Sequence, residues 1–391
     1  MRARRVFLIV LDSFGIGGAL DASAFGDEGA HTLKSVWSAG ARLTTLRSLG
    51  IGNIEGLSFV GETKAPLASV ARVREASMGK DTTIGHWEIA GHISKSPLPT
   101  FPDGFDDVII EKIKRISGRD VLCNKPYSGT AVIRDFGAEA LARGALIVYT
   151  SADSVLQIAA HVGVVPLDEL YRICTTLRGE LVGERDGVGR IIARPFTQNA
   201  DGEFVRTPDR RDYSLEPPVM LLPEAVKQSG LSSIAIGKIS DIFAGVGFTE
   251  TALTHSNKEG MERTLEYIRK DFEGLCFVNL VDFDMLFGHR RDARGYADAI
   301  SEFDAWASAA ISSLREDDVM IISADHGCDP DFIKTTDHTR ENVPLIIYGK
   351  NIEPRQYGIR NSFADIAATV AALLGTTLEC DGSAIDLEFK A

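Results

Sequence analysis

The hydrophobic residues of this chain are concentrated in short unbroken runs, which polar loops and amphipathic segments separate. An apolar run without alternation is typical of a β-strand that is covered on both faces. The runs that we expect to be strands of the main sheet are residues 6–11, 70–73, 233–236, 275–281, 319–323 and 345–348. The segments with helical character around them are residues 32–39, 257–273, 292–315 and 363–374. This alternation predicts an α/β fold with a mostly parallel sheet and helices on both faces.

Two breaks in this pattern set off a smaller domain inside the larger one. Residues 94–104 hold three prolines, and residues 207–218 are rich in proline and charge, so neither stretch continues a regular element. The pattern between them predicts a small α+β domain, with helices at residues 107–117, 135–143 and 167–181 and strands at residues 145–149 and 190–194. We therefore expect a core domain in two segments, residues 1–97 and 218–391, and an inserted domain at residues 98–217.

Composition and charge narrow the functional classes. Of the 391 residues, 44% are hydrophobic and 25% are charged, as in an ordinary soluble globular protein. The net charge of −13 argues against a nucleic-acid or anionic-membrane binder, which would carry a basic excess. The basic start precedes only six apolar residues, too few for a signal peptide, and no run is long enough to span a membrane. Five scattered cysteines without a CxxC pair predict a cytoplasmic protein, and nothing indicates an obligate protein partner.

Acidic residues follow three of the predicted strands. Asp12 ends the first run, Asp284 lies just beyond the run at residues 275–281, and the pair Asp325-His326 follows the run at residues 319–323. In open α/β sheets, ligands bind in the crevice outside the carboxyl ends of the strands, so distant segments would deliver these side chains to one place. With two histidines from neighbouring loops, the candidate ligands are Asp12, Asp284, His289, Asp325, His326 and His338.

Six mixed oxygen and nitrogen ligands are too many for one tetrahedral ion and suit a pair of metal ions. Carboxylate with imidazole favours a metal such as Mn²⁺ or Zn²⁺ over Ca²⁺. Two metals about 3.5–4 Å apart are a recurring device for phosphoryl transfer, because they stabilise the attacking and the leaving oxygens. Any single aspartate here would more often be a helix cap or a salt-bridge partner, and it is the complete set that favours a metal centre.

The string GKDTTIGHWEIAGH, residues 79–92, is expected to form a polar loop that carries a nucleophile. It offers two hydroxyl candidates, Thr82 and Thr83, beside Lys80 and Asp81. A threonine is a weak nucleophile unless a base or a metal removes its proton, but beside a metal pair it can accept a phosphoryl group. Without the metals, the string would be no more than a capped loop.

These motifs together resemble the phosphopentomutase family of the alkaline phosphatase superfamily. The resemblance is carried by GKDTTIGHWE, TSADSVLQIAAH, AIGKISDI, NLVDFDMLFGHRRD, ADHGCDP and TDHTRE, and it extends from VLDSFGIG near the start to FADIAATV near the end. It implies an alkaline-phosphatase-like core with the inserted domain as a cap. It also implies an isomerase that interconverts the 5-phosphate and the 1-phosphate of ribose or deoxyribose through a phosphothreonine and a bisphosphate intermediate.

The resemblance also implies roles for individual residues. Two Mn²⁺ ions would be bound, and Thr82 is implied as the phosphoryl carrier because it directly follows GKD. One ion would be held by Asp284, His289 and His338, and the other by Asp12, Asp325, His326 and the Thr82 oxygen. The sugar phosphate would meet Asp153, Arg190, Arg206 and Lys238. A sugar bisphosphate, ribose 1,5-bisphosphate or glucose 1,6-bisphosphate, would be the activator.

Two departures from the family pattern and two alternatives remain. Ile84 stands where the family usually has threonine, and Cys328 where it has asparagine, and we hypothesise that Cys328 makes the site sensitive to oxidation or to soft metals. His86, Trp87 and Glu88 are expected to hold the nucleophile loop rather than to catalyse. A related metallophosphatase or phosphoglycerate mutase would typically use serine and a different cap. A catalytically inactive metal- or nucleotide-binding protein would have lost a key residue, and all seven are present.

Overall fold

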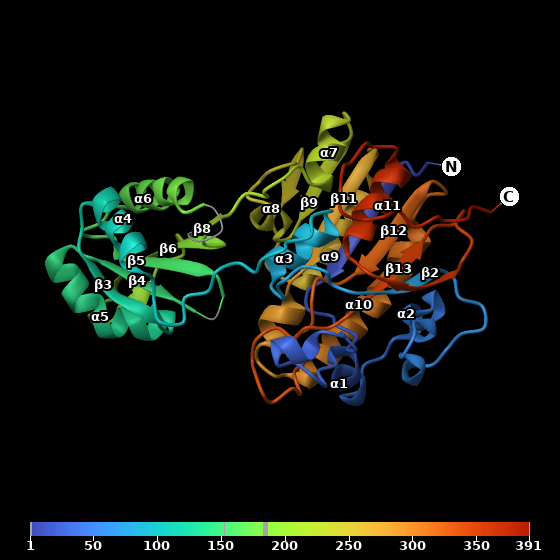
Figure 1. Cartoon of the computed structure of the whole chain (residues 1–391), viewed down its shortest axis with the longest axis horizontal. Coiled ribbons are helices and arrows are strands. Elements are labelled where there is room, and N and C mark those ends of the chain that lie inside the picture. The colour runs from blue at the N-terminus through green and yellow to red at the C-terminus, as the bar shows by residue number, and fades with distance from the viewer. Residues whose placement is uncertain (1, 152, 183–186, 391) are drawn as a thin grey trace. The chain divides into compact units, whose positions relative to one another are not determined.

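The computed structural model describes residues 2–151, 153–182 and 187–390. It divides into two compact units, a core unit of Met1–Lys95 with Pro217–Ala391 and an inserted unit of Ser96–Glu216. Both units contain a sheet with packed helices, as Figure 1 shows. The predicted α/β fold class is confirmed. In the described part of the chain, no helix is both long enough and apolar enough to cross a bilayer.

The core unit is built on a sheet in which the described strands follow the order β10-β9-β11-β1-β12-β13-β2-β14. The strands are β1 Arg5–Leu11, β2 Ser69–Val73, β9 Ser232–Ile236, β10 Glu250–Ala252, β11 Gly274–Leu280, β12 Asp318–Ser323, β13 Val343–Tyr348 and β14 Gln356–Arg360. Among these described strands, only β13 runs antiparallel to its neighbours, so the sheet is mostly parallel, as the sequence predicts. The short strands β10 and β14 were not predicted, and they form opposite edges of the sheet.

Strand β1 lies in the interior of this sheet, and all seven of its residues are buried. It pairs in parallel with β11 on one side and with β12 on the other, and Leu11 is level with Leu280. The carboxyl ends of these three strands therefore meet at one edge of the sheet. Burial on both faces explains why the strands read as unbroken apolar runs, since each fully buried aliphatic side chain contributes about 1.5–3 kcal/mol.

Helices cover the core sheet, and four of the eight described there form where the periodicity predicts, namely Thr32–Ser38, Asn257–Arg269, Ala293–Ser313 and Ala364–Leu374. They are α1 Thr32–Ser38, α2 Thr44–Leu49, α3 Thr82–Ile89, α7 Leu222–Gln228, α8 Ile239–Ile242, α9 Asn257–Arg269, α10 Ala293–Ser313 and α11 Ala364–Leu374. Three short 3₁₀ turns at Ala22–Phe25, Ile51–Asn53 and Ser58–Val60 complete the N-terminal segment.

The prediction of a loop over residues 79–92 is wrong, because the middle of this stretch is helix α3. Asp81 is the N-cap, and its Oδ1 accepts a hydrogen bond from the backbone N–H of Ile84 at 3.1 Å. The helix gives no amphipathic signal because its polar side chains are buried as well as its apolar ones: His86 and Glu88 are both 0% exposed. Propensity and pattern are overruled here by the buried polar contacts of these two side chains.

The inserted unit has a second sheet with the order β3-β4-β5-β6-β7, and β8 also pairs with β6. The strands are β3 Val121–Pro126, β4 Leu146–Thr150, β5 Val155–His161, β6 Arg190–Gln198, β7 Phe204–Arg206 and β8 Arg211–Ser214, and the helices are α4 Asp107–Ser117, α5 Gly129–Arg143 and α6 Leu167–Glu180. Leu146 and Val148 of β4 belong to one hydrophobic cluster, and Ile147 and Tyr149 to the cluster on the other face. Strands β3, β5, β7 and β8 were not predicted, and β8 lies inside the predicted break at residues 207–218.

Candidate active site

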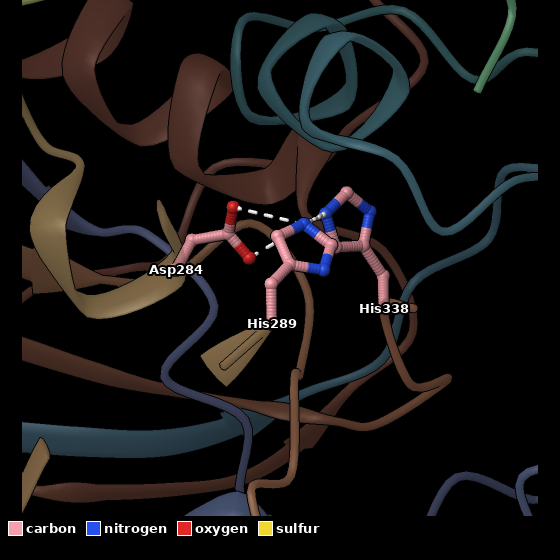
Figure 2. Close-up of side chains that lie close together, drawn as sticks. All are labelled: Asp284, His289 and His338. Atoms are coloured by element: carbon pink, nitrogen blue, oxygen red, sulfur yellow. Dashed lines mark hydrogen bonds and ion pairs between the residues drawn. The ribbon is translucent and has the colours of Figure 1, made fainter. Parts of the chain in front are cut away.

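Three of the predicted ligands, Asp284, His289 and His338, form a compact triad (Figure 2). His289 Nε2 lies 3.3 Å from Asp284 Oδ2, and His338 Nε2 lies 3.4 Å from Asp284 Oδ1. The two imidazole Nε2 atoms are 3.1 Å apart. One carboxylate and two ring nitrogens thus converge on a small volume, which is the arrangement expected of a metal-binding group.

A π-helical turn, Phe283–Gly288, brings the first two members of this triad together. It follows β11, and the backbone N–H of His289 donates to the carbonyl of Asp284 at 3.2 Å, which closes an i→i+5 ring. Residues five apart therefore lie on the same side of the turn, unlike residues five apart in an α-helix. Such π turns are rare and occur frequently at functional sites.

The other predicted ligands, Asp12, Asp325 and His326, form a second triad directly after β1 and β12. His326 Nε2 lies 3.4 Å from Asp12 Oδ1 and 3.3 Å from Asp325 Oδ2. Ser13, the residue after Asp12, also contacts this triad: its backbone N–H donates to Asp325 Oδ1 at 3.0 Å. Its φ of 70° is in the left-handed region, a strained conformation for serine that is characteristic of functional sites.

The two triads are adjacent. The rings of His326 and His338 stack with their centroids 4.0 Å apart, so the six side chains form one continuous cluster at the carboxyl edge of the core sheet. The structure thus brings all six candidate ligands together, in the two sets that the resemblance implies. That each of these six side chains is a metal ligand remains a prediction.

The chemistry of the cluster fits divalent cations. Among the described residues, Oδ1 of Asp12, Oδ1 of Asp284 and Oδ2 of Asp325 are buried and accept no well-aligned hydrogen bond, although imidazole nitrogens lie 3.1–3.4 Å from them. Burial, followed by the charge of Asp325, raises the pKa of Asp12. Burial opposes the ionisation of Asp325 too, but the imidazoles of His326 and His86 lower its pKa. Buried carboxylates of this kind are unfavourable unless they are paired or bind a metal, and a cation between them would supply the missing partner.

The candidate nucleophile Thr82 lies at the start of α3 and faces the second triad. Its Oγ1 is 3.2 Å from His326 Nε2, which is hydrogen-bonding distance. Gly85, one turn further along, allows this approach, because a Cβ there would collide with the backbone carbonyl of Asp325. The resemblance singled out Thr82 over Thr83, and the structure gives the Thr82 hydroxyl this contact with a candidate ligand.

Two buried polar residues orient the second triad. His86 Nδ1 lies 2.9 Å from the carbonyl oxygen of Thr82 and 3.1 Å from Asp325 Oδ2. Asn279, in β11, donates from Nδ2 to Asp12 Oδ2 at 2.9 Å. Partners of this type fix the direction of metal ligands and are nearly as important as the ligands themselves. Sequence reasoning missed Asn279, although an asparagine inside the apolar run of β11 is a recognisable signal of a buried polar contact.

Glu88 ties helix α3 to neighbouring segments, in line with the holding role that the sequence analysis predicted for it. Its carboxylate accepts hydrogen bonds from the backbone N–H groups of Ala76 and Ser77, each within 2.8 Å. It also accepts from the Ser362 hydroxyl at 2.7 Å and from the Phe363 N–H at 2.9 Å, at the start of α11. A fully satisfied buried carboxylate of this kind rigidifies its surroundings, here the helix that presents Thr82.

Cys328 lies beside the first triad, with Sγ 4.0 Å from His289 Nδ1. Burial raises the pKa of its thiol to about 12, so it is protonated at neutral pH. Thiolates rather than thiols are oxidised and bind metals, so this environment opposes the hypothesis of a sensitive cysteine. Replacing Cys328 by asparagine tests the hypothesis, which predicts a lower sensitivity to peroxide in the variant.

The predicted substrate residues belong to both units. Lys238 is in the core unit, where its Nζ lies 3.9 Å from Sδ of Met285, the residue after Asp284. Arg190 is in the inserted unit, and its guanidinium pairs with Asp212 at 3.6 Å. Arg206 and Asp153 also belong to the inserted unit, Arg206 exposed and Asp153 half-buried. That these four residues bind a sugar phosphate remains a prediction.

Comparison with known proteins adds evidence that is independent of this geometry. The metalloenzyme superfamily model matches residues 4–378. A phosphopentomutase of Lachnoclostridium phytofermentans is 53% identical over 370 residues, 94% of each chain. A phosphopentomutase of Acetivibrio thermocellus is 48% identical and covers 97% of this chain and 98% of its own. A crystal structure of phosphoglycerate mutase from Leishmania mexicana has the same fold, with a TM-score of 0.51, 13% identity and coverage of 100% of this chain and 98% of that chain.

Proposed function

Because the chain belongs to the phosphopentomutase family of the metalloenzyme superfamily, we propose that it interconverts (deoxy)ribose 5-phosphate and (deoxy)ribose 1-phosphate through a phosphothreonine at Thr82. The observation that carries this proposal is the contact of Thr82 Oγ1 with His326 Nε2 at 3.2 Å, beside two triads of potential metal ligands. Family membership supports isomerase activity and divalent metal binding. We include Mn²⁺ as the metal in this proposal, because mixed carboxylate and imidazole ligands suit it.

The chain's own residues would prepare the hydroxyl for transfer. Asp284, His289 and His338 would hold one ion, and Asp12, Asp325, His326 and the Thr82 oxygen the other. When bound, such ions neutralise charge on the transferring phosphoryl group and stabilise the threonine alkoxide. His86 and Asn279 would keep the ligands Asp325 and Asp12 in their orientations through the contacts described above.

The location of Thr82 at the N-terminus of α3 also favours a phosphoryl group there. The first backbone N–H groups of a helix have no acceptor within the helix, and the helix dipole places partial positive charge at this end. A phosphate on the first helical residue would therefore be stabilised by the backbone. The buried contacts of Glu88 would keep the helix from moving as the charge is transferred.

The proposed reaction moves one phosphoryl group onto the sugar and another off it. Phosphorylated Thr82 donates to the C1 hydroxyl of a pentose 5-phosphate, so that the Oγ1–P bond breaks, a C1 O–P bond forms and the hydroxyl proton passes to water. The resulting 1,5-bisphosphate turns around and returns its 5-phosphoryl group to Thr82. The O5–P bond breaks, the Oγ1–P bond forms again, and O5 takes up a proton as the pentose 1-phosphate is released. A sugar bisphosphate, ribose 1,5-bisphosphate or glucose 1,6-bisphosphate, would supply the first phosphoryl group.

We assign substrate binding to Asp153, Arg190, Arg206 and Lys238, with the inserted unit as a cap. Arginine forks suit phosphate oxygens, and a carboxylate suits ribose hydroxyl groups. A cap that excludes water would protect the phosphothreonine, whose hydrolysis inactivates a mutase. The free thiols of Cys123, Cys174, Cys276, Cys328 and Cys380 agree with a reducing compartment such as the cytoplasm.

Phosphorus NMR tests the proposal directly. The Mn²⁺-loaded protein is incubated with ribose 5-phosphate and a trace of glucose 1,6-bisphosphate, and the ribose 1-phosphate signal is followed. We expect this signal to appear, to vanish with a chelator and to be absent with Thr82→Ala. Thr83→Ala is the matched control, because it removes the neighbouring hydroxyl from the same helix, and it should retain turnover.

Two outcomes would contradict the proposal. Release of inorganic phosphate without ribose 1-phosphate would mean that the protein is a phosphatase. Turnover by Thr82→Ala close to that of the wild type would mean that another group carries the phosphoryl. Mass spectrometry of the protein after incubation with glucose 1,6-bisphosphate provides an independent reading, because the added phosphate should be found on Thr82.

A further inference from the structure

A buried arginine lies next to the nucleophile turn, two residues beyond His338. The side chain of Arg340 is only 2% exposed, and all three guanidinium nitrogens have partners. Nε and Nη2 donate to the Asp21 carboxylate at 3.1 and 2.8 Å. Nη1 donates to the carbonyl of Gly79 at 2.6 Å and pairs with the Glu75 carboxylate at 2.6 Å, while Nη2 donates to the Glu75 carbonyl at 2.8 Å.

A second junction beside this guanidinium ties the same segments together. The backbone N–H of Arg340 and Nζ of Lys80 both donate to Oδ2 of Asp27, each at 2.8 Å. The loop around Asp27, the turn that leads to Thr82 and the segment after His338 are therefore fastened to one another at a single buried point.

We propose that Arg340 is a positioning residue for phosphoryl transfer at Thr82, an inference that rests on the proposed role of Thr82 as the phosphoryl carrier. Gly79 precedes Thr82 by three residues, and Arg340 follows His338 by two, so the guanidinium sets the nucleophile turn against a segment that carries a candidate metal ligand. Reacting atoms must approach to about 3–3.5 Å, and a displacement of 1 Å can cost about 10²-fold in rate.

The shape of the guanidinium is essential to this role. Its fork reaches the carboxylates of Asp21 and Glu75 and the carbonyl of Gly79 at the same time, through three different nitrogens. A lysine ammonium keeps the charge but has a single nitrogen, which cannot replace three nitrogens held in a fixed fork. Arg340→Lys should therefore preserve the charge balance and release the turn before Thr82.

The core sheet provides a matched control in Arg5, at the start of β1. Arg5 is 0% exposed and pairs with the carboxylate of Asp318 at 2.7 and 2.6 Å, and its Nη1 donates to backbone carbonyls such as that of Lys270 at 2.6 Å. The chemistry of its contacts matches that of Arg340. Arg5 lies at the amino end of β1, however, whereas the triads lie beyond the carboxyl ends of the strands. Arg5→Lys thus measures what the loss of a buried arginine fork does to stability alone.

The experiment compares wild type, Arg340→Lys and Arg5→Lys as full-length, Mn²⁺-loaded proteins. It measures kcat and KM for ribose 5-phosphate, the melting temperature, and the single-turnover rate of Thr82 phosphorylation by glucose 1,6-bisphosphate. For Arg340→Lys we expect kcat and the phosphorylation rate to fall together by about 10²-fold, with KM changed by less than about threefold. For Arg5→Lys we expect a lower melting temperature and an unchanged kcat per folded molecule.

A second pair of variants guards against failure to fold. Asp21 is half exposed, with 46% of its side chain accessible, so Asp21→Asn should fold while it weakens the outer anchor of Arg340. We expect kcat to fall by about tenfold with little change in melting temperature. Its control is Asp298→Asn, which removes the carboxylate of an exposed Arg294–Asp298 pair of similar geometry and should leave kcat unchanged.

The proposal is overturned if Arg340→Lys and Asp21→Asn both phosphorylate Thr82 at the wild-type rate, whatever their melting temperatures. It is also overturned if Arg5→Lys loses kcat to the same extent as Arg340→Lys, because the effect would then follow from general destabilisation. If the wild type takes up no phosphate on Thr82, the proposed function fails first and the role of Arg340 with it. Uptake by the wild type that is slowed selectively in the two Arg340 network variants supports the inference.

Discussion

Strand β1 carries buried charge at both of its ends, and the two ends are built in opposite ways. At its start, the guanidinium of Arg5 donates hydrogen bonds from Nε and Nη2 to the two carboxylate oxygens of Asp318. Its remaining nitrogen, Nη1, donates to backbone carbonyl groups. Directly after its end, Asp12 lies beside Asp325 and His326, and its buried Oδ1, 3.4 Å from His326 Nε2, accepts no well-aligned hydrogen bond among the described residues. We call the Arg5 end complete, because the charged atoms of the Arg5–Asp318 pair have partners within the protein. We call the Asp12 end incomplete, because a carboxylate oxygen there accepts no well-aligned hydrogen bond.

The difference separates groups that stabilise the fold from groups that serve chemistry. A buried ion pair with every polar atom matched holds β1 and β12 in register but has no capacity left for a ligand. A cluster of buried carboxylates with unmatched oxygens is unfavourable in the protein alone and becomes favourable when cations bind. Strand β12 repeats the contrast, since Asp318 begins it and Asp325 follows it two residues after its end.

The strongest test of this contrast is Asp325→Asn, at the incomplete end. We expect the rate of ribose 1-phosphate formation to fall at least about 10³-fold, because metal ions supply several kcal/mol of transition-state stabilisation. Because the imidazoles of His326 and His86 lower the pKa of Asp325, its carboxylate is stabilised in the folded state, and the metal-free variant should remain folded but melt at a lower temperature. A variant that keeps its activity, or unfolds, would show that Asp325 belongs with the structural charges instead.

The same substitution at the complete end should have the opposite outcome. Asp318→Asn leaves the buried Arg5 guanidinium without its carboxylate, and we expect the free energy of unfolding to fall by about 3–5 kcal/mol. Urea denaturation at a temperature where the variant is folded measures this loss. The kcat per folded molecule should remain that of the wild type, and a large drop in kcat would contradict the division between the two ends.

The rise in melting temperature on adding Mn²⁺ should distinguish the two ends of β1. Ligand that binds only the native state stabilises it by about 2.7 kcal/mol at a free concentration of 100 times Kd. We expect Mn²⁺ to raise the melting temperature of the chelator-treated wild type and of Asp318→Asn by similar amounts. The rise should be much smaller in Asp325→Asn, and an equal rise in all three would place the metal elsewhere.

The smallest expected effect concerns the residue that orients the incomplete end. His86→Gln loses the donor at the Nδ1 position, which contacts the Thr82 carbonyl and Asp325, and we expect a 10–100-fold loss of activity or Mn²⁺ affinity. His86→Asn places an amide nitrogen at the same position and should recover part of the loss. Equal defects in both variants would indicate that the ring fills space rather than orients ligands.

The sequence predicted the strands that carry the candidate ligands because burial on both faces leaves an unbroken apolar run. The acids after β1, β11 and β12 could therefore be placed at one edge before the structure was known. The π turn that joins Asp284 to His289 could not be predicted, since an i→i+5 turn leaves no periodicity in so short a segment. Helix α3 was missed because its buried face is polar, with His86 and Glu88 in place of apolar residues.

The partners of the buried arginines could not be predicted either. Arg5 and Asp318 are 313 residues apart in the chain, and the Arg340 guanidinium reaches Gly79 across 261 residues. No local pattern indicates which buried charge will meet which. In the inserted unit, the sequence predicts a break where β8 forms, because Arg211–Ser214 is a short polar segment that becomes a strand only by pairing with β6.

The interior location of β1 also has a consequence for how the protein folds. The first strand of the chain pairs with β11 and β12, so its partners are synthesised some 270 and 310 residues later. The described strand pairs of the inserted unit, in contrast, all join segments within Ser96–Glu216. Contacts of long sequence separation form slowly, and unpaired apolar strands promote aggregation in the meantime. We therefore expect the inserted unit to fold first during synthesis on the ribosome, while β1 remains unpaired. Asp12 and Asp325 would come into proximity only near the end of synthesis.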